Sequence, residues 1–184
     1  MDPEKAVRLM AEKARAVQAI VSEVTAFDEA VAYAMDFTKQ QARKTIAAPG
    51  IDGDRRALLE SSCRSAGVTL LGSPLLESAD RIQTAFTLAD WGIAETGTLV
   101  LKSASEDIRL ATMLAEVHVA LLAQSRILPD AETLAPQLNA ILLDETPSYT
   151  AFITGASRTA DIERVLAIGV HGPQELHILI QKGC

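Results

Sequence analysis

The sequence predicts an α/β fold in which strands and helices alternate around a largely parallel sheet. Three observations lead to this prediction. Short apolar runs of strand length recur between residues 45 and 181, and amphipathic stretches of helix length separate several of them. The length of 184 residues fits one domain with a helical appendage. Aromatic residues make up only 4% of the chain, so Leu, Ile, Val and Ala must build the core.

The first 24 residues predict an N-terminal helical segment. Asp2 can cap a helix whose first residue is Pro3. Apolar side chains then recur at steps of three and four and form one stripe: Ala6, Val7, Met10, Ala14, Val17, Ile20, Val21 and Val24. The sequence TAFD at 25–28 is typical of a capping box, so either a second helix begins there or the first one bends. We therefore expect a helical segment over 1–24 and a main domain over 25–184.

The later elements follow from their patterns in chain order. KTIAAPG predicts a short strand that ends in a turn, residues 54–66 a helix, and GVTLLG at 67–72 a buried strand. WGIAETGTLVLKS predicts two strands joined by a turn near 95–97. Further strands are expected in EVHVALLA at 116–123, YTAFITG at 149–155 and QELHILIQ at 174–181, with a helix near 131–142. This alternation is typical of a layered α/β domain, in which ligands bind beyond the carboxyl ends of the strands.

Charge and cysteine content argue against several classes of protein. The net charge is −7 and the basic residues are scattered among acids, which disfavours a nucleic-acid partner. Cys63 and Cys184 lie far apart and form no CxxC pair, so no conventional zinc or iron–sulfur site is expected in this chain. Cys63 is expected to be a small buried residue. The sequence shows neither a signal peptide nor an apolar run of bilayer length, so a cytoplasmic location is expected.

The stretch TGASRTADIERVLAIGVHGP at 154–173 concentrates polar chemistry between apolar runs. Gly155 follows the predicted buried strand AFIT and allows a tight turn, and Ser157 or Thr159 could cap a helix that begins at Ala160. The free N–H groups of a helix start attract anions, and Arg158 could clamp a phosphate or carboxylate. Asp161 and Glu163 could orient a neighbouring arginine or act as bases. Alternatively, these polar residues form an ordinary helix cap and bind no ligand.

A second polar group, AETGT at 94–98, lies at the predicted turn between two strands. Glu95 stands between Ala94 and Thr96. A buried carboxyl at this position would suit acid–base or nucleophilic chemistry. The alternative is an exposed acid in a hairpin turn. Because polar groups are costly to bury without partners, we expect the AETGT turn and the GASRTAD loop to meet in one cleft.

The three histidines differ in their surroundings. His171 lies in a tight turn between Val170 and Gly172, where it could exchange a proton with a ligand or simply bond to the backbone. His118 and His177 alternate with aliphatic residues in predicted strands, so both are expected to be hydrogen-bonded core residues. A metal site made of His171, Asp161 and Glu163 would lack a recognised ligand spacing, and no metal is expected.

An ordered set of motifs resembles the LUD domain family, and within it the lactate utilization protein C group. The set consists of GIAETGTLVL at 92–101, Arg109 before a short apolar stretch, His118 in the next strand, SRTADIE and GVHGP. It covers roughly residues 25–182. Ala156 departs from the pattern, because relatives commonly have Pro there, which would stiffen the loop. The region between Lys102 and Arg109 also lacks the Gly-rich character that is common in relatives.

The resemblance implies a Rossmann-type layer like that of the NagB/RpiA/CoA-transferase group. It also implies a subunit of a three-protein system that oxidises L-lactate to pyruvate, with iron–sulfur clusters on the partner proteins and no cofactor on this chain. Combined with the residue patterns, it predicts Glu95 and His171 as catalytic residues. The predicted ligand-binding residues are Thr96, Gly97, Arg109, Gly155, Ser157, Arg158, Thr159, Asp161 and Gly172.

Two other functions fit the same residues. The first is a stand-alone enzyme that acts on a CoA-like or phosphorylated ligand with Glu95 as nucleophile or base. The second is an assembly module without catalytic activity. Co-purification with iron–sulfur proteins would favour the lactate system, and acyl transfer by the isolated chain would favour the enzyme.

Overall fold

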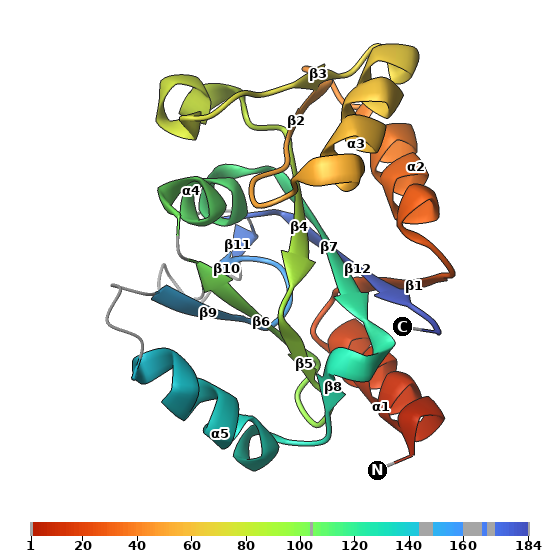
Figure 1. The fold of residues 1–184 in the computed structure, drawn as a ribbon, viewed down its shortest axis with the longest axis vertical. Coiled ribbons are helices and arrows are strands. Elements are labelled where there is room, and N and C mark those ends of the chain that lie inside the picture. Colours follow the sequence, from red (N-terminus) through yellow and green to blue (C-terminus); the bar gives the residue numbers. More distant parts are fainter. Residues whose placement is uncertain (1, 104, 144–148, 160–166, 169–171, 184) are drawn as a thin grey trace.

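The computed structural model describes residues 2–103, 105–143, 149–159, 167–168 and 172–183. Figure 1 shows the arrangement of their helices and strands. In chain order the elements are α1 Pro3–Ala16, β1 Ile20–Val24, α2 Phe27–Thr38, β2 Thr45–Ala47, α3 Gly53–Ala66, β3 Thr69–Leu70, η1 Leu75–Arg81, β4 Thr84–Ala89, β5 Trp91–Ile93, β6 Thr98–Ser103, α4 Glu106–Leu114, β7 Val117–Ala123, η2 Gln124–Arg126, β8 Ile127–Leu128, α5 Ala131–Leu142, β9 Tyr149–Ile153, β10 Arg158–Thr159, β11 Ala167–Ile168 and β12 Glu175–Gln181.

The main sheet confirms the predicted α/β class. It has six strands in the order β1-β12-β7-β4-β2-β3, and all neighbouring pairs are parallel. Alternate side chains of each strand point to opposite faces. On one face, Phe86, Val119 and Leu179 pack with buried residues of α2 and α3, the two helices that lie together at one side of Figure 1. On the other face, Ala120 and Ile178 pack with α1.

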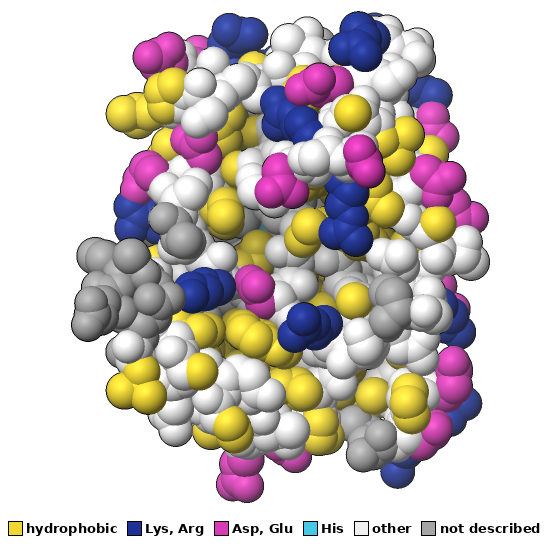
Figure 2. Space-filling view, in the orientation of Figure 1, with side chains coloured by type: hydrophobic (Ala, Val, Ile, Leu, Met, Phe, Trp, Pro, Cys, Tyr) yellow, Lys and Arg dark blue, Asp and Glu magenta, His cyan; other side chains and the backbone are white. Residues whose placement is uncertain are grey.

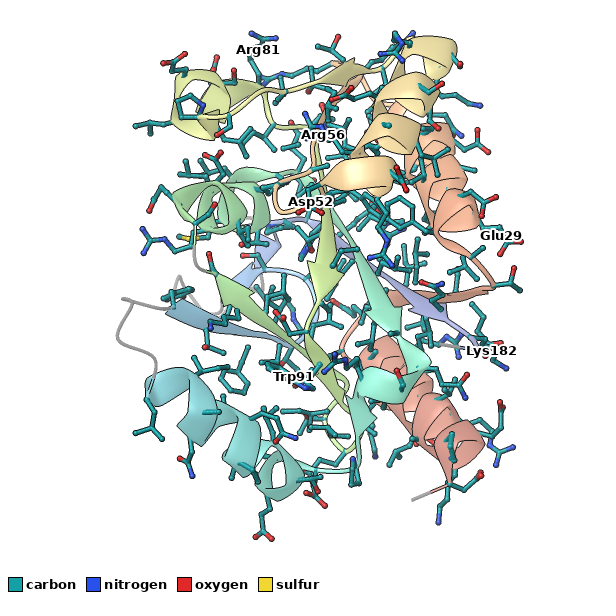
Figure 3. The ribbon with its side chains drawn as sticks, in the orientation of Figure 1. Glu29, Asp52, Arg56, Arg81, Trp91 and Lys182 are labelled. Atoms are coloured by element: carbon teal, nitrogen blue, oxygen red, sulfur yellow. The ribbon has the colours of Figure 1, made fainter. Side chains whose placement is uncertain are left out.

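A second sheet has four strands in the order β8-β5-β6-β9. The strands β5 and β6 form the predicted hairpin, and Ile93 of β5 pairs with Thr98 of β6. One face of this sheet packs on α1 through Leu99 and Leu101. The other face packs on α5, where Trp91, labelled in Figure 3, packs against the cluster that contains Leu134. The small sheet thus lies between α1 and α5.

One expectation for the N-terminal segment needs correction. The helix ends at Ala16, and residues 20–24 form the edge strand β1, which pairs with β12. The aliphatic residues of this segment fit the spacing of a helix stripe, but they are also good strand formers. Backbone pairing with the edge of β12 favours the strand. The second helix does begin near TAFD, at Phe27. The division into a segment over 1–24 and a domain over 25–184 stays a prediction.

The strand β9 differs most from expectation. The segment YTAFITG was expected to be a buried strand of the parallel sheet, but β9 pairs antiparallel with β6 in the small sheet, and Phe152 is 51% exposed. The predicted strand at 67–72 is likewise reduced to Thr69–Leu70 at the sheet edge, where neither residue is buried. Gly155 therefore does not follow a parallel strand. The rule that places ligands beyond the carboxyl ends of parallel strands does not apply to it.

Candidate functional site

A cavity of about 250 Å³ lies at the amino ends of β7 and β12. We call it the amino-end pocket. Two of its lining residues, His118 and Leu176, are the second residues of those strands. Its lining consists of Thr112, Met113, His118, Phe152, Ile153, Thr154, Gly155, Ser157, Gly172, Pro173 and Leu176. Three predicted ligand-binding residues, Gly155, Ser157 and Gly172, are therefore brought to one cavity.

Backbone contacts fix the wall that these three residues form. The Ser157 N–H donates to the Pro173 carbonyl at 2.8 Å, which ties the loop after β9 to the segment before β12. A Cβ placed on Gly172 would lie 3.2 Å from the Ser157 Cβ and 3.3 Å from its hydroxyl oxygen. A larger residue at 172 would therefore collide with the Ser157 side chain.

The AETGT turn reaches the pocket through a row of hydroxyl groups. The Thr96 and Thr98 hydroxyl oxygens lie 2.7 Å apart, and those of Thr98 and Thr154 also lie 2.7 Å apart. The row exists because the start of β6 lies beside the end of β9, where Leu99 pairs with Ile153. The turn thus lies beside Thr154, which directly precedes the GASRTAD loop, and the shared cleft stays a prediction. However, the described lining of the pocket includes Thr154 and none of Glu95, Thr96 or Gly97.

The motif glycines Gly97 and Gly155 both face the end of α1. Each has a left-handed backbone, with φ of +67° and +76°. A Cβ on Gly97 would lie 2.2 Å from the Ala14 nitrogen, and one on Gly155 would lie 2.3 Å from the Val17 carbonyl oxygen. Only a residue without a side chain fits at either place. Both glycines therefore allow the end of α1 to pack closely against the hairpin and the pocket wall.

Glu95 is exposed, so the burial on which its predicted acid–base role depends is missing. Its Oε1 accepts a hydrogen bond from the Ala131 N–H at 3.2 Å, at the first residue of α5. A carboxylate is favoured there because the first N–H groups of a helix have no intrahelical partner and the helix dipole is positive at that end. The contact gives Glu95 a clear structural task, and its catalytic role stays a prediction.

The two predicted arginines lie outside the pocket lining. Arg109 of α4 makes an ion pair with Glu106, and its guanidinium lies 5.8 Å from the centre of the Tyr149 ring. Arg158 of β10 is exposed. Its Nη2 lies only 3.0 Å from the position of a Cβ on Gly155, so its positive charge borders the pocket wall.

Three predicted site residues cannot be located in full. His171 and Asp161 lie outside the described residues, as do Glu163 and the expected helix start at Ala160. The backbone of Thr159 forms part of β10, which pairs with β11, while its side chain is outside the described part. The roles of these residues remain predictions.

His118 is the pocket residue that the sequence pattern misassigned. It is fully buried, and its Nε2 lies 2.8 Å from the Thr87 hydroxyl, but its Nδ1 has no hydrogen-bond partner among the described residues. Burial lowers the pKa of His118 to about 4, so the imidazole is neutral near pH 7. The alternation of the strand predicts burial correctly. It cannot reveal that the residue lines a pocket and that one ring nitrogen has no partner among the described residues.

His177 and Cys63 agree with expectation. His177 is buried, with Nδ1 at 2.8 Å from the Tyr33 hydroxyl and Nε2 at 2.9 Å from a Glu175 carboxylate oxygen. Cys63 is buried in α3, and desolvation raises the pKa of its thiol to about 11. Among the described residues, no group of three His, Cys, Asp or Glu side chains is arranged to hold a metal ion. In the same part of the chain, no helix has the length and apolar character needed to cross a membrane.

The chain is similar to proteins that are called lactate utilization protein C. The protein of that name from Macrococcus caseolyticus is 36% identical over 104 residues, which cover 55% of this chain and 45% of that protein. The corresponding protein from Anoxybacillus flavithermus is 38% identical over 102 residues, with the same coverage. This chain therefore spans about half the length of the curated relatives it matches.

Two further comparisons cover nearly the whole chain. The crystal structure of a DUF162 family protein from Deinococcus radiodurans superposes with a TM-score of 0.72 at 19% identity, covering 98% of this chain and 99% of that one, and this likeness concerns the fold. The family model described as the LUD domain matches residues 7–181. The chain thus belongs to the LUD domain family.

Proposed function

We propose that this chain is a subunit of an L-lactate-oxidising assembly and that its amino-end pocket binds a small carboxylate. The observation that carries the proposal is the meeting of Gly155, Ser157 and Gly172 with the buried His118 at one cavity. The similarity to proteins named lactate utilization protein C supports lactate or pyruvate as the carboxylate. A volume of about 250 Å³ suits a ligand of that size better than a CoA-like one.

The lining offers complementary groups for a hydroxy acid. When the Thr87 oxygen accepts from Nε2–H of His118, the opposite nitrogen Nδ1 is an acceptor without a partner among the described residues. This atom is itself buried, so a ligand hydroxyl would donate to it only after the lining side chains shift. The Ser157 hydroxyl can donate to a carboxylate, and Arg158 at the wall adds positive charge. The apolar lining from Phe152, Ile153 and Leu176 would surround the methyl group.

Partner proteins would carry the electrons. Conversion of lactate to pyruvate releases two electrons and two protons. The two cysteines of this chain are too few for the four thiolates of an iron–sulfur cluster, and Cys63 is buried. Iron–sulfur partners are therefore part of the proposal, and the isolated chain is expected to be colourless and unable to oxidise lactate. Acyl transfer through Glu95 gains no support from an exposed carboxylate that binds the start of α5.

Titration of the purified chain with L-lactate and with pyruvate, followed by NMR, tests the pocket. We expect saturable binding, and Arg158→Ala should weaken it by roughly 1.5–3 kcal/mol because a charged hydrogen bond is lost. Ser157→Ala should also weaken it, and Arg81→Ala, on the exposed η1, should not. Thermal melting should change little in all three variants.

Lactate-dependent growth supplies the second readout. In cells that lack the natural copy, Arg158→Ala should fail to restore growth while Arg81→Ala restores it. Binding of neither acid at high concentration would refute the pocket assignment. Failed growth together with a large drop in melting temperature would make Arg158 a structural clamp instead.

A further inference from the structure

The opposite end of the parallel sheet carries a second hollow, which we call the carboxyl-end cleft. It consists of two cavities of about 330 and 240 Å³ that share Leu88 and Asp90 at the end of β4. Figure 2 shows it on the visible face, where Lys and Arg side chains border the hollowed middle of the molecule. This is the end at which parallel α/β sheets generally bind ligands.

The topology brings two arginines to this cleft from opposite sides. In the sheet order, β4 lies between β7 and β2. Arg126 belongs to η2, which follows β7, and Arg55 belongs to α3, which follows β2. Both line the same cavity, and Asp90 at the end of β4 lies in the lining between them. Strand order, rather than nearness in sequence, therefore assembles the charged groups.

Neither arginine is neutralised by an ion pair within the described part of the chain. Arg55 is exposed, and its guanidinium lies 5.2 Å from the centre of the Phe27 ring. Its neighbour Arg56, labelled in Figure 3, is instead paired with Glu60 at 2.9 Å. Arg126 is exposed as well, and its charge acts on Asp90. Two such guanidinium groups in one cavity make a site for an anion.

Asp90 is a half-buried carboxyl held in place by the backbone. Its Oδ2 accepts a hydrogen bond from the Lys102 N–H at 2.6 Å. Desolvation raises the pKa of Asp90, while this hydrogen bond, Arg126 and Lys102 lower it. As a fixed oxygen acceptor beside two cations, Asp90 suits a ligand that presents a hydroxyl group next to its anionic group.

We propose that the carboxyl-end cleft binds a small phosphate monoester, whose phosphate contacts Arg55 and Arg126 and whose hydroxyl donates to Asp90. A phosphate fits better than a carboxylate because it carries up to two negative charges and three outer oxygens that point in different directions, which suits two guanidinium groups from separate elements. The Ser125 hydroxyl, in the same lining, can add a further donor. This site is independent of the amino-end pocket.

Phosphorus NMR and calorimetry on the full chain, with inorganic phosphate and glycerol 3-phosphate as probes, test the proposal. We expect saturable binding of both probes, and tighter binding of glycerol 3-phosphate because it also carries hydroxyl groups. Arg55→Gln and Arg126→Gln should each weaken binding by about tenfold or more, as for loss of a charged hydrogen bond. Arg64→Gln, on the exposed surface near the end of α3, is the matched control and should bind like wild type.

Asp90→Asn separates the roles of charge and hydroxyl recognition. Removing a negative charge should tighten inorganic phosphate binding and reduce the preference for glycerol 3-phosphate. Arg158→Ala should leave phosphate binding unchanged, so this proposal and the lactate pocket can fail separately. Absence of saturable binding, or equal binding by Arg55→Gln, Arg126→Gln and wild type, would overturn the proposal. Competition between lactate and phosphate that Arg158→Ala relieves and Arg55→Gln leaves unchanged would also overturn it, because it would place both ligands in the amino-end pocket.

Discussion

The two ends of the parallel sheet offer two different kinds of site. The amino-end pocket is lined by glycines, hydroxyl groups, apolar side chains and one buried histidine, and several of these residues belong to the motifs that resemble the LUD family. The carboxyl-end cleft is lined by arginines and an aspartate that lie outside those motifs. Family motifs and the general ligand-binding rule of parallel sheets thus point to opposite ends of one molecule. The motif residues therefore serve either binding or packing, and substitutions at these residues distinguish the two roles.

The largest effect is expected from Gly97→Ala. The new Cβ would overlap the α1 backbone at Ala14, and the left-handed φ adds strain. Left-handed backbone costs a residue with a side chain about 1–2 kcal/mol, and overpacking typically adds about 1–3 kcal/mol. We expect the free energy of unfolding to fall by about 4 kcal/mol, measured by urea denaturation.

Gly183→Ala is the control for this substitution. Gly183 has a similar φ of +76°, but a Cβ there would meet no atom within 4 Å. It should therefore lose only the backbone cost of about 1–2 kcal/mol. If Gly97→Ala were no worse than Gly183→Ala, α1 would not be fixed against the motif turn. Packing would then not explain that glycine, and a ligand-binding role would gain weight.

Local sequence patterns predict some elements of the fold and miss others. The hairpin, α3, β7 and β12 follow from local patterns of alternation and capping, and the structure has them near the predicted positions. The central strand β4 escapes prediction because TAFTLA mixes small and polar residues without a clear period. Its burial comes from neighbours β2 and β7, which are distant in sequence. The choice of sheet for β9 likewise depends on a long-range partner.

The sites show the same division between local and long-range information. Gly155, Ser157 and Gly172 line one cavity because the Ser157–Pro173 contact ties the segment after β9 to the segment before β12. His118 enters the pocket through β7, and Arg55 and Arg126 meet through strand order. A pattern along the chain carries no information about such a meeting.

A smaller effect is expected from the pH dependence of His118. The pKa is about 4 in the folded chain and about 6.5 when unfolded. Between these values the unfolded chain binds a proton that the folded chain does not, so stability falls as the pH drops below 6.5 and levels off below about 4. The full loss is about 3 kcal/mol.

Urea denaturation at pH 7.5 and pH 4.5 measures this loss. His118→Gln, which can still bond to Thr87, should lose less stability than wild type over that interval. A bound carboxylate in the amino-end pocket should change the pH dependence further. An unchanged pH dependence in His118→Gln would mean that the imidazole is not a buried neutral group, and the pocket would need another polar anchor.

The smallest effect is expected at Glu95, where binding and packing make opposite predictions. Its bond to the Ala131 N–H places a negative charge at the start of α5, a contact worth about 0.3–1 kcal/mol at an exposed site. Glu95→Gln should therefore lower the melting temperature by only a few degrees. Glu77→Gln, an exposed acid in the first turn of η1, serves as the control and should cause a smaller change.

In the reconstituted assembly, a helix-capping Glu95 predicts that Glu95→Gln keeps most lactate oxidation. A loss of activity of more than about a hundredfold, the scale of a missing acid–base catalyst, with a nearly unchanged melting temperature would instead make Glu95 catalytic. The reacting carboxylate would then have to lie at the hairpin turn, and the hydroxyl row from Thr96 to Thr154 would connect two parts of one site.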